Sequence, residues 1–381
     1  MKIVVAIDSF KGSISSIEAG NAIKKGILKH NKNHQVVVKG VADGGEGTVQ
    51  TLIESLNGQY KTVTICNPDG IYQDSYYGIV ENKVIIEVAL ASGIMMTKNK
   101  NPLKATSYGL GEMIKDALNN GYRHFIIGLG GSATNDGGMG MLEALGYRFY
   151  DENHQLLKGN GENLIKIAYI DESCRLPELK DCHFNIASDV NAILCGQNGA
   201  SVIFGPQKGA DEYTVKLLDQ GLYHYADVIC CQLKKKDERN ILGAGAAGGL
   251  GYCFKTFFDS QITPGLSLVN KITHLEDELR DADVVFTGEG RIDCQTKLNK
   301  VPFAISQLAK KYHCRTIALA GQIEKEAYEL NELGIDALFS IIQGVVTLDE
   351  AMESENTKRN LENTAYQIMS ILGGTYESCS N

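Results

Sequence analysis

Patterns typical of strands and helices alternate along both ends of this 381-residue chain. Near the start, the segment KIVVAID (2–8) is apolar and β-branched, as a strand buried on both faces is. Ser15 and Glu18 follow at the spacing of a helix capping box. The pattern continues as strand 35–42, helix 47–56 and strand 61–66. Strands that alternate with helices in this way predict a parallel sheet.

The same alternation returns near the C-terminus. The segments are strand 282–288, helix 302–312, strand 315–321, helix 327–334, strand 336–342 and a last helix near 360–372. Between the two ends, SYYGIVENKVIIEVA (75–89) is typical of an antiparallel hairpin. We therefore expect an α/β fold with a discontinuous, Rossmann-like domain, a doubly wound parallel sheet formed by residues 1–66 and 282–381. Residues 67–281 would form an inserted α/β domain.

Net charge and composition exclude several classes of partner. The chain has a formal net charge of −9 and a pI of about 5.5, and its lysines and arginines are scattered, so we expect neither nucleic acid nor a membrane as its partner. The N-terminal apolar run is too short for a signal peptide, no run approaches transmembrane length, and the ten cysteines include no CxxC pair. These features predict a cytoplasmic protein, and an acidic chain of this kind is compatible with a monomer or a homodimer.

Glycine gathers in five stretches together with acidic, amide or hydroxyl side chains. In chain order they are DSFKGS (8–13), ADGGEGT (42–48), GLGGSATNDGG (128–138), GAGAAGGLG (243–251) and TGEGRIDCQT (287–296). Three of them directly follow a predicted strand. Ligands of open α/β sheets bind at the carboxyl ends of the strands, so we expect these loops to converge on one cleft.

The stretch 128–138 has the features of an anion-binding loop. It follows a strand, which is itself preceded by an amphipathic helix pattern at 110–121, and a further helix begins after it. Glycines let backbone N–H groups approach an oxyanion, and a helix N-terminus adds positive potential. The candidate binding residues are Gly130, Gly131, Ser132, Thr134, Asn135 and Asp136. The alternative is a tight turn, in which Asn135 and Asp136 face inward and brace the loop.

The stretch 243–251 contains a literal GxGxxG in Gly243, Gly245 and Gly248. A dinucleotide-binding fingerprint must follow an apolar strand, whereas QLKKKDERNI precedes this one. The pattern therefore favours a small-residue loop that allows close packing over a dinucleotide site.

Carboxylates and a few cations follow several predicted strands. They are Asp8, Lys11, Asp43, Glu46, Asp189, Glu289, Arg291 and Asp293. Mg²⁺ prefers oxygen ligands, an attacking hydroxyl needs a proton acceptor, and a transferred phosphoryl group needs positive charge nearby. The set therefore favours phosphoryl transfer. Each acid taken singly could instead cap a helix, but capping alone does not account for the whole set.

Taken together, the glycine-rich loops resemble the bacterial glycerate kinases of the first type. Six blocks carry the resemblance, in the family's order: the segments at 8–13, 42–48, 128–138, NGASVIFGPQKGA (198–210), 243–251, and TGEGRID (287–293) followed by Gln295, Thr296 and Lys300. The resemblance covers nearly the whole chain. It implies a discontinuous Rossmann/flavodoxin-like domain with a second α/β domain inserted, and an active site in the cleft between the domains.

The resemblance implies ATP-dependent phosphorylation of D-glycerate, with 2-phosphoglycerate favoured over 3-phosphoglycerate as the product and Mg²⁺ as the metal. Our working hypothesis for this reaction is that Asp189 or Asp293 accepts the hydroxyl proton, with Lys11 as a further catalytic residue. Substrate or phosphate would contact Asp8, Ser9, Lys11, Gly130, Gly131, Ser132, Thr134, Asn135, Asp136, Glu289, Arg291 and Lys300. Asp43, Glu46 and Glu289 would hold Mg²⁺ directly or through water.

Several alternatives stay open at this point. The chain could phosphorylate another small hydroxy acid, or it could be a non-catalytic metabolite-binding protein on the same fold. A dinucleotide oxidoreductase would need the 243–251 stretch to bind a pyrophosphate. The string GLGGSA echoes the phosphate loop of galactokinase and homoserine kinase, but the other five blocks have no place in that family.

Overall fold

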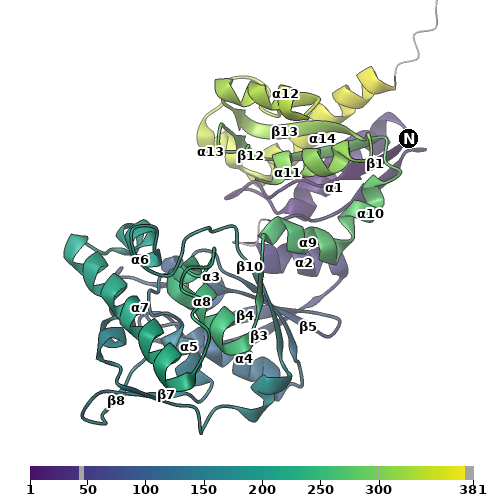
Figure 1. Ribbon diagram of the computed structural model, residues 1–381. Helices are drawn as coiled ribbons and strands as arrows, with labels where there is room; N and C mark the ends of the chain where they lie inside the picture. Colours follow the sequence, from purple (N-terminus) through teal and green to yellow (C-terminus); the bar gives the residue numbers. More distant parts are fainter. Residues whose placement is uncertain (43–46, 298–299, 374–381) are drawn as a thin grey trace, which may run out of the picture. The chain divides into compact units, whose positions relative to one another are not determined.

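The computed structural model describes residues 1–42, 47–297 and 300–373. The chain forms two compact units, each drawn in Figure 1. The first unit comprises Met1–Asp43, Gln50–Leu56 and Val269–Asn381, and the second comprises Gly44–Val49 and Asn57–Leu268. Each unit has its own sheet and its own apolar core.

The first unit contains a parallel five-stranded sheet in the order β14-β13-β12-β1-β2. Its strands are β1 (Lys2–Val5), β2 (Gln35–Val38), β12 (Val284–Ile292), β13 (Arg315–Ile323) and β14 (Ala337–Ser340). Its helices are α1 (Ser16–His30), α10 (Leu275–Leu279), α11 (Val301–Lys310), η5 (Lys325–Glu329), α12 (Leu330–Leu333), α13 (Leu348–Met352) and α14 (Ser354–Leu372). Numbered within the unit, the strand order is 2-1-3-4-5, the order of flavodoxin-like sheets.

Helices cover both faces of this sheet because alternate residues of each strand point to opposite sides. On β13, Ile317 and Leu319 join the core formed with α1 and α14, whereas Ala318 and Ala320 pack with residues of η5 and α12. The predicted capping box of α1 is present: the Ser15 side chain accepts from the Glu18 N–H, and the Glu18 carboxylate accepts from the Ser15 N–H. The prediction of a doubly wound parallel sheet is confirmed for this unit.

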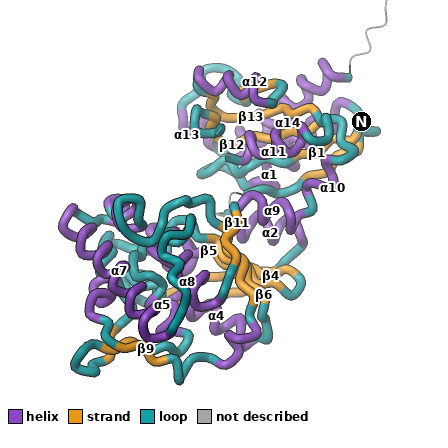
Figure 2. Tube along the Cα trace, in the orientation of Figure 1, coloured by secondary structure: helices purple, strands orange, loops and turns teal. Residues whose placement is uncertain are grey.

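The second unit is built on a mixed six-stranded sheet in the order β11-β10-β6-β5-β4-β3. Its strands are β3 (Gln59–Cys66), β4 (Tyr72–Val80), β5 (Lys83–Glu87), β6 (His124–Gly128), β10 (His183–Ala187) and β11 (Gln261–Thr263). A second, three-stranded antiparallel sheet joins β7 (Arg148–Tyr150), β8 (Leu156–Leu157) and β9 (Tyr169–Asp171). Figure 2 shows the strands of the six-stranded sheet side by side.

Helices and short 3₁₀ turns surround these sheets. They are α3 (Val88–Ser92), η1 (Ile94–Met96), α4 (Tyr108–Asn119), α5 (Met139–Ala144), η2 (Gly161–Lys166), η3 (Pro177–Asp181), α6 (Ala200–Phe204), η4 (Pro206–Lys208), α7 (Glu212–Leu233) and α8 (Ala246–Phe258). Two further helices, α2 (Thr48–Leu56) and α9 (Gly265–Thr273), span the points where the chain passes from one unit to the other.

One strand lies in a different sheet from the one expected. Residues 61–66 were predicted as a third strand of the N-terminal parallel sheet, but β3 pairs antiparallel with β4 in the second unit. The prediction was wrong because β3 and β4 form a long hairpin with β5, and an antiparallel neighbour needs no crossover helix. The hairpin predicted at 75–89 is confirmed by the pairing of β4 with β5.

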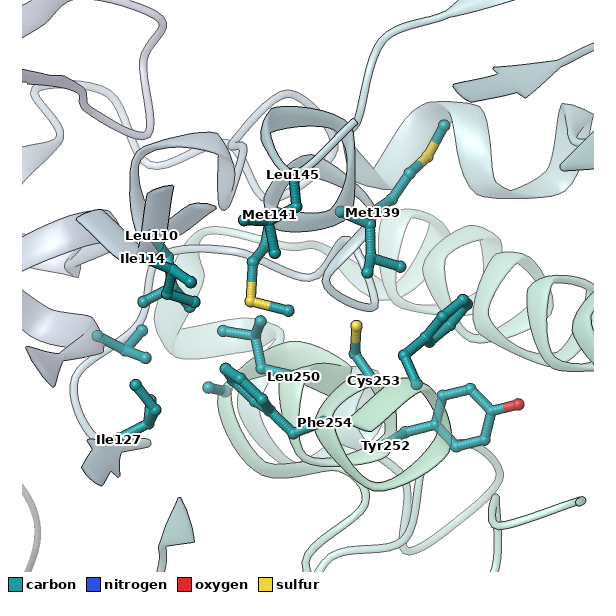
Figure 3. Close-up of a cluster of buried hydrophobic side chains, with 14 of the residues drawn as sticks. Leu110, Ile114, Ile127, Met139, Met141, Leu145, Leu250, Tyr252, Cys253 and Phe254 are labelled. Atoms are coloured by element: carbon teal, nitrogen blue, oxygen red, sulfur yellow. The ribbon is translucent and has the colours of Figure 1, made fainter. Parts of the chain in front are cut away.

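The core of the second unit lies between α4, α5, α8 and the sheet, as Figure 3 shows. The predicted apolar face of α4 is fully used: Leu110, Met113, Ile114, Ala117 and Leu118 are all buried. None of the helices in the described ranges is both long and apolar enough to cross a lipid bilayer. The nine cysteines within those ranges are free thiols.

Candidate active site

The strand order of the first unit reverses direction between β1 and β12, since β2 lies beyond one and β13 beyond the other. Open α/β sheets bind ligands at this switch point, outside the carboxyl ends of the strands. The chain leaves β1 there through Asp8, whose N–H donates to the carbonyl of Gly288 at 2.9 Å. The loop after β1 and the end of β12 are therefore neighbours.

A cavity of about 840 Å³ opens at this point of the first unit. Every described candidate that the sequence offered in this unit lines it: Asp8, Ser9, Lys11, Glu289, Arg291, Asp293 and Lys300. The volume lies in the range of roughly 300–1,000 Å³ that is usual for small-molecule sites. Asp43 and Glu46, the acidic candidates of the 42–48 stretch, lie outside the described residues.

Glu289 is a half-buried acid of the cavity. Its carboxylate accepts a hydrogen bond from the Thr296 hydroxyl at 2.9 Å. Burial raises the pKa of Glu289 above its ordinary value, although Thr296, Lys300 and Lys11 act in the opposite direction. A partly desolvated carboxylate in a cleft is typical of a functional group, because such burial costs stability.

Asp293 is held ionised by its neighbours. The N–H of Gln295 donates to its carboxylate at 2.8 Å, and Lys300 Nζ lies 3.4 Å away. Burial alone would raise the pKa of Asp293, but the Gln295 N–H and the Lys300 charge together bring it below its ordinary value. Asp293 is therefore a carboxylate at neutral pH, with a cation beside it.

The other polar residues of the cavity have more local partners. Arg291 forms an ion pair with Glu324, and its positive charge also helps to lower the pKa of Asp293. The Asp8 carboxylate accepts from the Ser9 N–H at 2.7 Å, so it is fixed at the start of the loop. Lys11 and Lys300 are then the cations that act on the Glu289 carboxylate.

The donor set fits Mg²⁺ carried by a nucleotide better than a metal held by protein alone. Among the described residues no group of three or more His, Cys, Asp or Glu side chains could hold a metal ion. Glu289 and Asp293 nevertheless both face the cavity. Mg²⁺ is usually bound by one or two carboxylates, with phosphate oxygens and waters completing its shell, so two acids are enough.

In the second unit, three parallel strands end side by side. Glu87 of β5, Gly128 of β6 and Ala187 of β10 lie in register across the sheet. Asp189 follows β10 by two residues and is exposed. Gly130 is half-buried, and Gly131 is exposed with a left-handed φ of 67°. These residues occupy the ligand-binding edge of the second sheet.

A buried lysine supports the 128–138 loop. Lys208, at the end of η4, is 3% exposed, and its ammonium group donates to Ser132 Oγ at 2.9 Å and to the Thr134 carbonyl at 2.6 Å. Burial lowers the pKa of Lys208 to about 7, against the attraction of the Asp136 carboxylate. Lys208 belongs to the 198–210 block, but the sequence analysis did not single it out. The available signal was a lysine among small residues and a proline.

Asp136 braces the loop from inside. Its carboxylate is fully buried and accepts from the Ser107 N–H and hydroxyl and from the N–H groups of Gly138 and Gly140. This corrects the expectation that Asp136 contacts substrate. It also corrects the expectation that the helix after the loop points free N–H groups at an anion, because Asp136 already takes N–H groups at the start of α5.

Thr134 and Asn135 also point into the protein. Both are fully buried, and the Asn135 amide donates to Ser201 Oγ at 3.0 Å. Within the described residues, Thr134 Oγ1 and Asn135 Oδ1 have no hydrogen-bond partner. The expected contact of these two side chains with substrate stays a prediction, and in this structure neither side chain has a solvent-facing surface. The exposed part of the loop is Gly130 and Gly131.

Two further residues went unnoticed in the sequence. Glu87 is 3% exposed at the end of β5 and accepts from the N–H groups of Gly47 and Val49, so it anchors the segment that follows the 42–46 acids. Ser201 holds the Asn135 amide. In the sequence, Glu87 directly follows the apolar run at 84–86, and this position could have singled it out as a candidate.

The 243–251 stretch packs against the 128–138 loop, as the sequence favoured. The Gly137 N–H donates to the Gly248 carbonyl at 3.0 Å, and a Cβ on Gly248 would lie 2.0 Å from the Thr134 carbonyl oxygen. In the described segment 234–245 no strand leads into this stretch, which opens α8. Its glycines allow two backbones to touch, and they do not form a dinucleotide fingerprint.

Comparison with known proteins gives one consistent result. A family model described as the glycerate kinase family matches residues 3–373. The chain is similar to a glycerate kinase of Halalkalibacterium halodurans, with 40% identity over 94% of this chain and 97% of the relative. It is 42% identical to a glycerate 2-kinase of Escherichia coli, over 92% of this chain and 93% of the relative. A crystal structure described as glycerate kinase 2 from Salmonella typhimurium LT2 superposes with a TM-score of 0.89 at 40% identity, covering 98% of both chains.

Proposed function

The chain belongs to the glycerate kinase family, and from this premise we propose that it transfers the γ-phosphoryl group of ATP to a hydroxyl group of D-glycerate. One observation carries the proposal. Five of the acids and lysines that the sequence put forward for phosphoryl transfer line a single cavity at the switch point of the first unit: Asp8, Lys11, Glu289, Asp293 and Lys300. Carboxylates to accept a proton and hold a metal, together with cations for phosphate, are what this reaction requires.

We assign Asp293 as the acceptor of the hydroxyl proton. Its depressed pKa keeps it ionised at neutral pH, and Lys300 beside it holds the carboxylate in place. Lys11 and Lys300 would bind phosphate oxygens and the carboxylate of glycerate. Asp8, Ser9 and Arg291 would line the same cavity as binding groups. Positioning and charge supply most of the catalysis in phosphoryl transfer.

Glu289 is the residue that we expect to hold Mg²⁺, directly or through water, and Asp43 and Glu46 stay predictions for the same role. Its raised pKa fits this assignment, because a carboxylate that is costly to ionise gains most from a nearby cation. When bound, Mg²⁺ would neutralise the charge that develops on the phosphate oxygens.

From the second unit, we propose that Gly130, Gly131 and Ser132 offer backbone N–H groups to substrate or phosphate, with Lys208 fixing Ser132 from behind. Asp189 is the second candidate for the proton acceptor, since it is exposed just after β10. Asn135, Thr134 and Asp136 are left out of the proposed contacts because they are buried.

We favour the 2-hydroxyl of glycerate as the acceptor. The support is that the E. coli relative, 42% identical over 92% of this chain, is named a glycerate 2-kinase. Phosphorus NMR of the product formed from D-glycerate and ATP tests this directly. Resonances that match 2-phosphoglycerate support the assignment, and resonances that match 3-phosphoglycerate contradict it.

A coupled assay of ADP release tests the activity itself. Purified protein is given ATP, Mg²⁺ and either D-glycerate, L-glycerate, glycolate or lactate. We expect ADP release that depends on both D-glycerate and Mg²⁺. Release with another hydroxy acid alone would make the chain a kinase of that acid, and no acid-dependent release with any of them would point to a metabolite-binding protein.

A further inference from the structure

The cavity of the first unit has two chemically different sides. The loop after β1, the end of β12 and the loop after β12 supply the polar side, described above. The segment between β14 and α14, which contains α13, supplies an apolar wall: Ile341, Ile342, Val346, Leu348, Ala351 and Met352. Figure 1 shows α13 beside β12 and β13 within this unit.

Three side chains of the apolar wall are exposed to solvent. Val346 is 45% exposed, Leu348 is 73% exposed and Met352 is 38% exposed. Large apolar side chains that are grouped, exposed and turned into a cavity indicate a binding surface, because leaving them in water costs free energy that a ligand can recover.

Glycerate cannot use such a wall. Each of its carbons carries an oxygen, so it has almost no apolar surface to bury, and the phosphates of a nucleotide have none. The cavity, at about 840 Å³, is also far larger than such an acid needs. Among the reactants of a kinase, only the nucleotide base presents a flat apolar face of matching size.

Two glycines without side chains also line the cavity. Gly290 and Gly321 both line the cavity, and a Cβ on Gly321 would lie 2.9 Å from the Gly290 carbonyl oxygen. Gln322, the next residue of β13, also lines the cavity, and its amide can both donate to and accept from the edge of a base. A flat ring could therefore lie over the glycines, with its polar edge toward Gln322.

We propose that the apolar wall of residues 341–352 binds the purine base of the phosphoryl donor, so that the donor's phosphates lie toward Lys11, Glu289 and Lys300. This inference rests on the proposed kinase function, and it assigns the nucleotide to the first unit. In this arrangement the base and the phosphates occupy the same cavity, and all residues that line this cavity belong to the first unit.

Adenosine is the most direct probe, because it carries the base but no phosphate. Its dissociation constant, and that of ADP, are measured by calorimetry in the absence of glycerate. The variants are Val346→Thr and Leu348→Asn, which remove apolar contact without adding charge at exposed positions. We expect each to weaken adenosine and ADP binding by about 5-fold or more, and the double variant by more than about 10-fold.

Val345→Thr is the matched control. Val345 is fully exposed and adjoins Val346, but it does not line the cavity. The same substitution there should leave nucleotide binding unchanged. In steady-state kinetics, the double variant should raise KM for ATP and leave KM for glycerate within about twofold. A binding loss in the Val345 variant equal to that of the Val346 variant would overturn the inference.

The outcomes for the inference and for the proposed function are separable. If the wild type releases ADP with D-glycerate but the double variant binds adenosine and ADP normally, the function stands and the base site is wrong. If the double variant raises KM for glycerate instead, the wall serves the acceptor and the inference is overturned. If no hydroxy acid supports turnover while adenosine still binds and the double variant loses it, the base site stands and the kinase function fails.

Discussion

The ammonium group of Lys208 lies 2.9 Å from the Ser132 hydroxyl, 76 residues away in the sequence, and joins η4 to the glycine-rich loop after β6. The same group donates to the Thr134 carbonyl at 2.6 Å. One buried side chain thus holds both the hydroxyl and the backbone of the loop whose exposed part is Gly130 and Gly131. We therefore treat Lys208 as a positioning residue for that loop.

Replacement of Lys208 by methionine should loosen the loop more than it unfolds the protein. Ser132 Oγ and the Thr134 carbonyl lose their donor, at about 1–3 kcal/mol for each buried group left unpaired, but the cost of burying a charge disappears as well. We expect kcat/KM to fall by about 10-fold or more with little loss of thermal stability. Lys100→Met is the control, since exposed Lys100 donates to the Gln207 carbonyl of the same region at 3.2 Å. Wild-type kinetics in Lys208→Met would contradict the positioning role.

Lys208 should also make stability depend on pH. Burial lowers the pKa of Lys208 to about 7, whereas in the unfolded chain an amine stays protonated up to about pH 10. Between these values the unfolded chain binds more protons, so this group makes stability rise with pH from about 7 upward, and its buried charge reduces stability below that window. The Tm of the wild type minus that of Lys208→Met should therefore increase between pH 6.5 and 9. Parallel Tm curves for the two proteins would show that Lys208 does not titrate there.

Glu289→Gln should raise the stability of the protein and reduce its activity. Burial raises the pKa of Glu289, so the folded protein binds more protons than the unfolded chain just above pH 4, and stability falls as pH rises through that window. Above that window, ionisation of the half-buried Glu289 costs stability, and a neutral glutamine removes this cost. We expect a higher Tm at pH 7.5 and turnover reduced by about 10-fold or more. Glu329→Gln, at an exposed ion pair with Lys297, should change neither.

Asp293→Asn should remove turnover and spare the fold. A proton acceptor contributes about 100-fold to 10,000-fold to such a reaction, whereas the amide oxygen of asparagine can still accept from the Gln295 N–H. We expect kcat to fall by at least about 100-fold with Tm within a few degrees of the wild type. Exposed Asp277→Asn serves as the control. If Asp293→Asn keeps its turnover and Asp189→Asn loses it, the acceptor lies in the second unit.

Replacement of Asp136 should instead reduce the stability of the fold. Asp136→Ala leaves the N–H groups of Ser107, Gly138 and Gly140 without their acceptor inside the core. Each such buried donor costs about 1–3 kcal/mol, so denaturant unfolding should show a large loss of stability. Surface Asp181→Ala should unfold as the wild type does. A stable Asp136→Ala protein with a raised KM would instead return Asp136 to the substrate site.

The sequence by itself determined the local structure and the chemistry of the loops. The strand and helix pattern gave β1, α1, β12 and β13, because burial on both faces of a parallel sheet demands continuous apolar runs. The grouping of acids and lysines with glycine after β1 and β12 identified the residues that line one cavity. These features depend on residues that are close together in the sequence, so they can be predicted without knowledge of the tertiary structure.

Tertiary structure decided where each strand pairs and which way each loop side chain points. The pattern at 61–66 is a strand in either sheet, and only its antiparallel pairing with β4 assigned it to the second unit. In the sequence, Asn135 and Asp136 favoured ligand contacts over a simple turn but left both open, and in the structure both side chains are part of the interior. Lys208 acquired its role only when η4 met the loop at 128–138. These outcomes depend on contacts between residues that are distant in the sequence. Burial and the distance to a partner decide which hydrogen bonds form and which groups are charged, and the sequence pattern specifies neither the burial nor the distance.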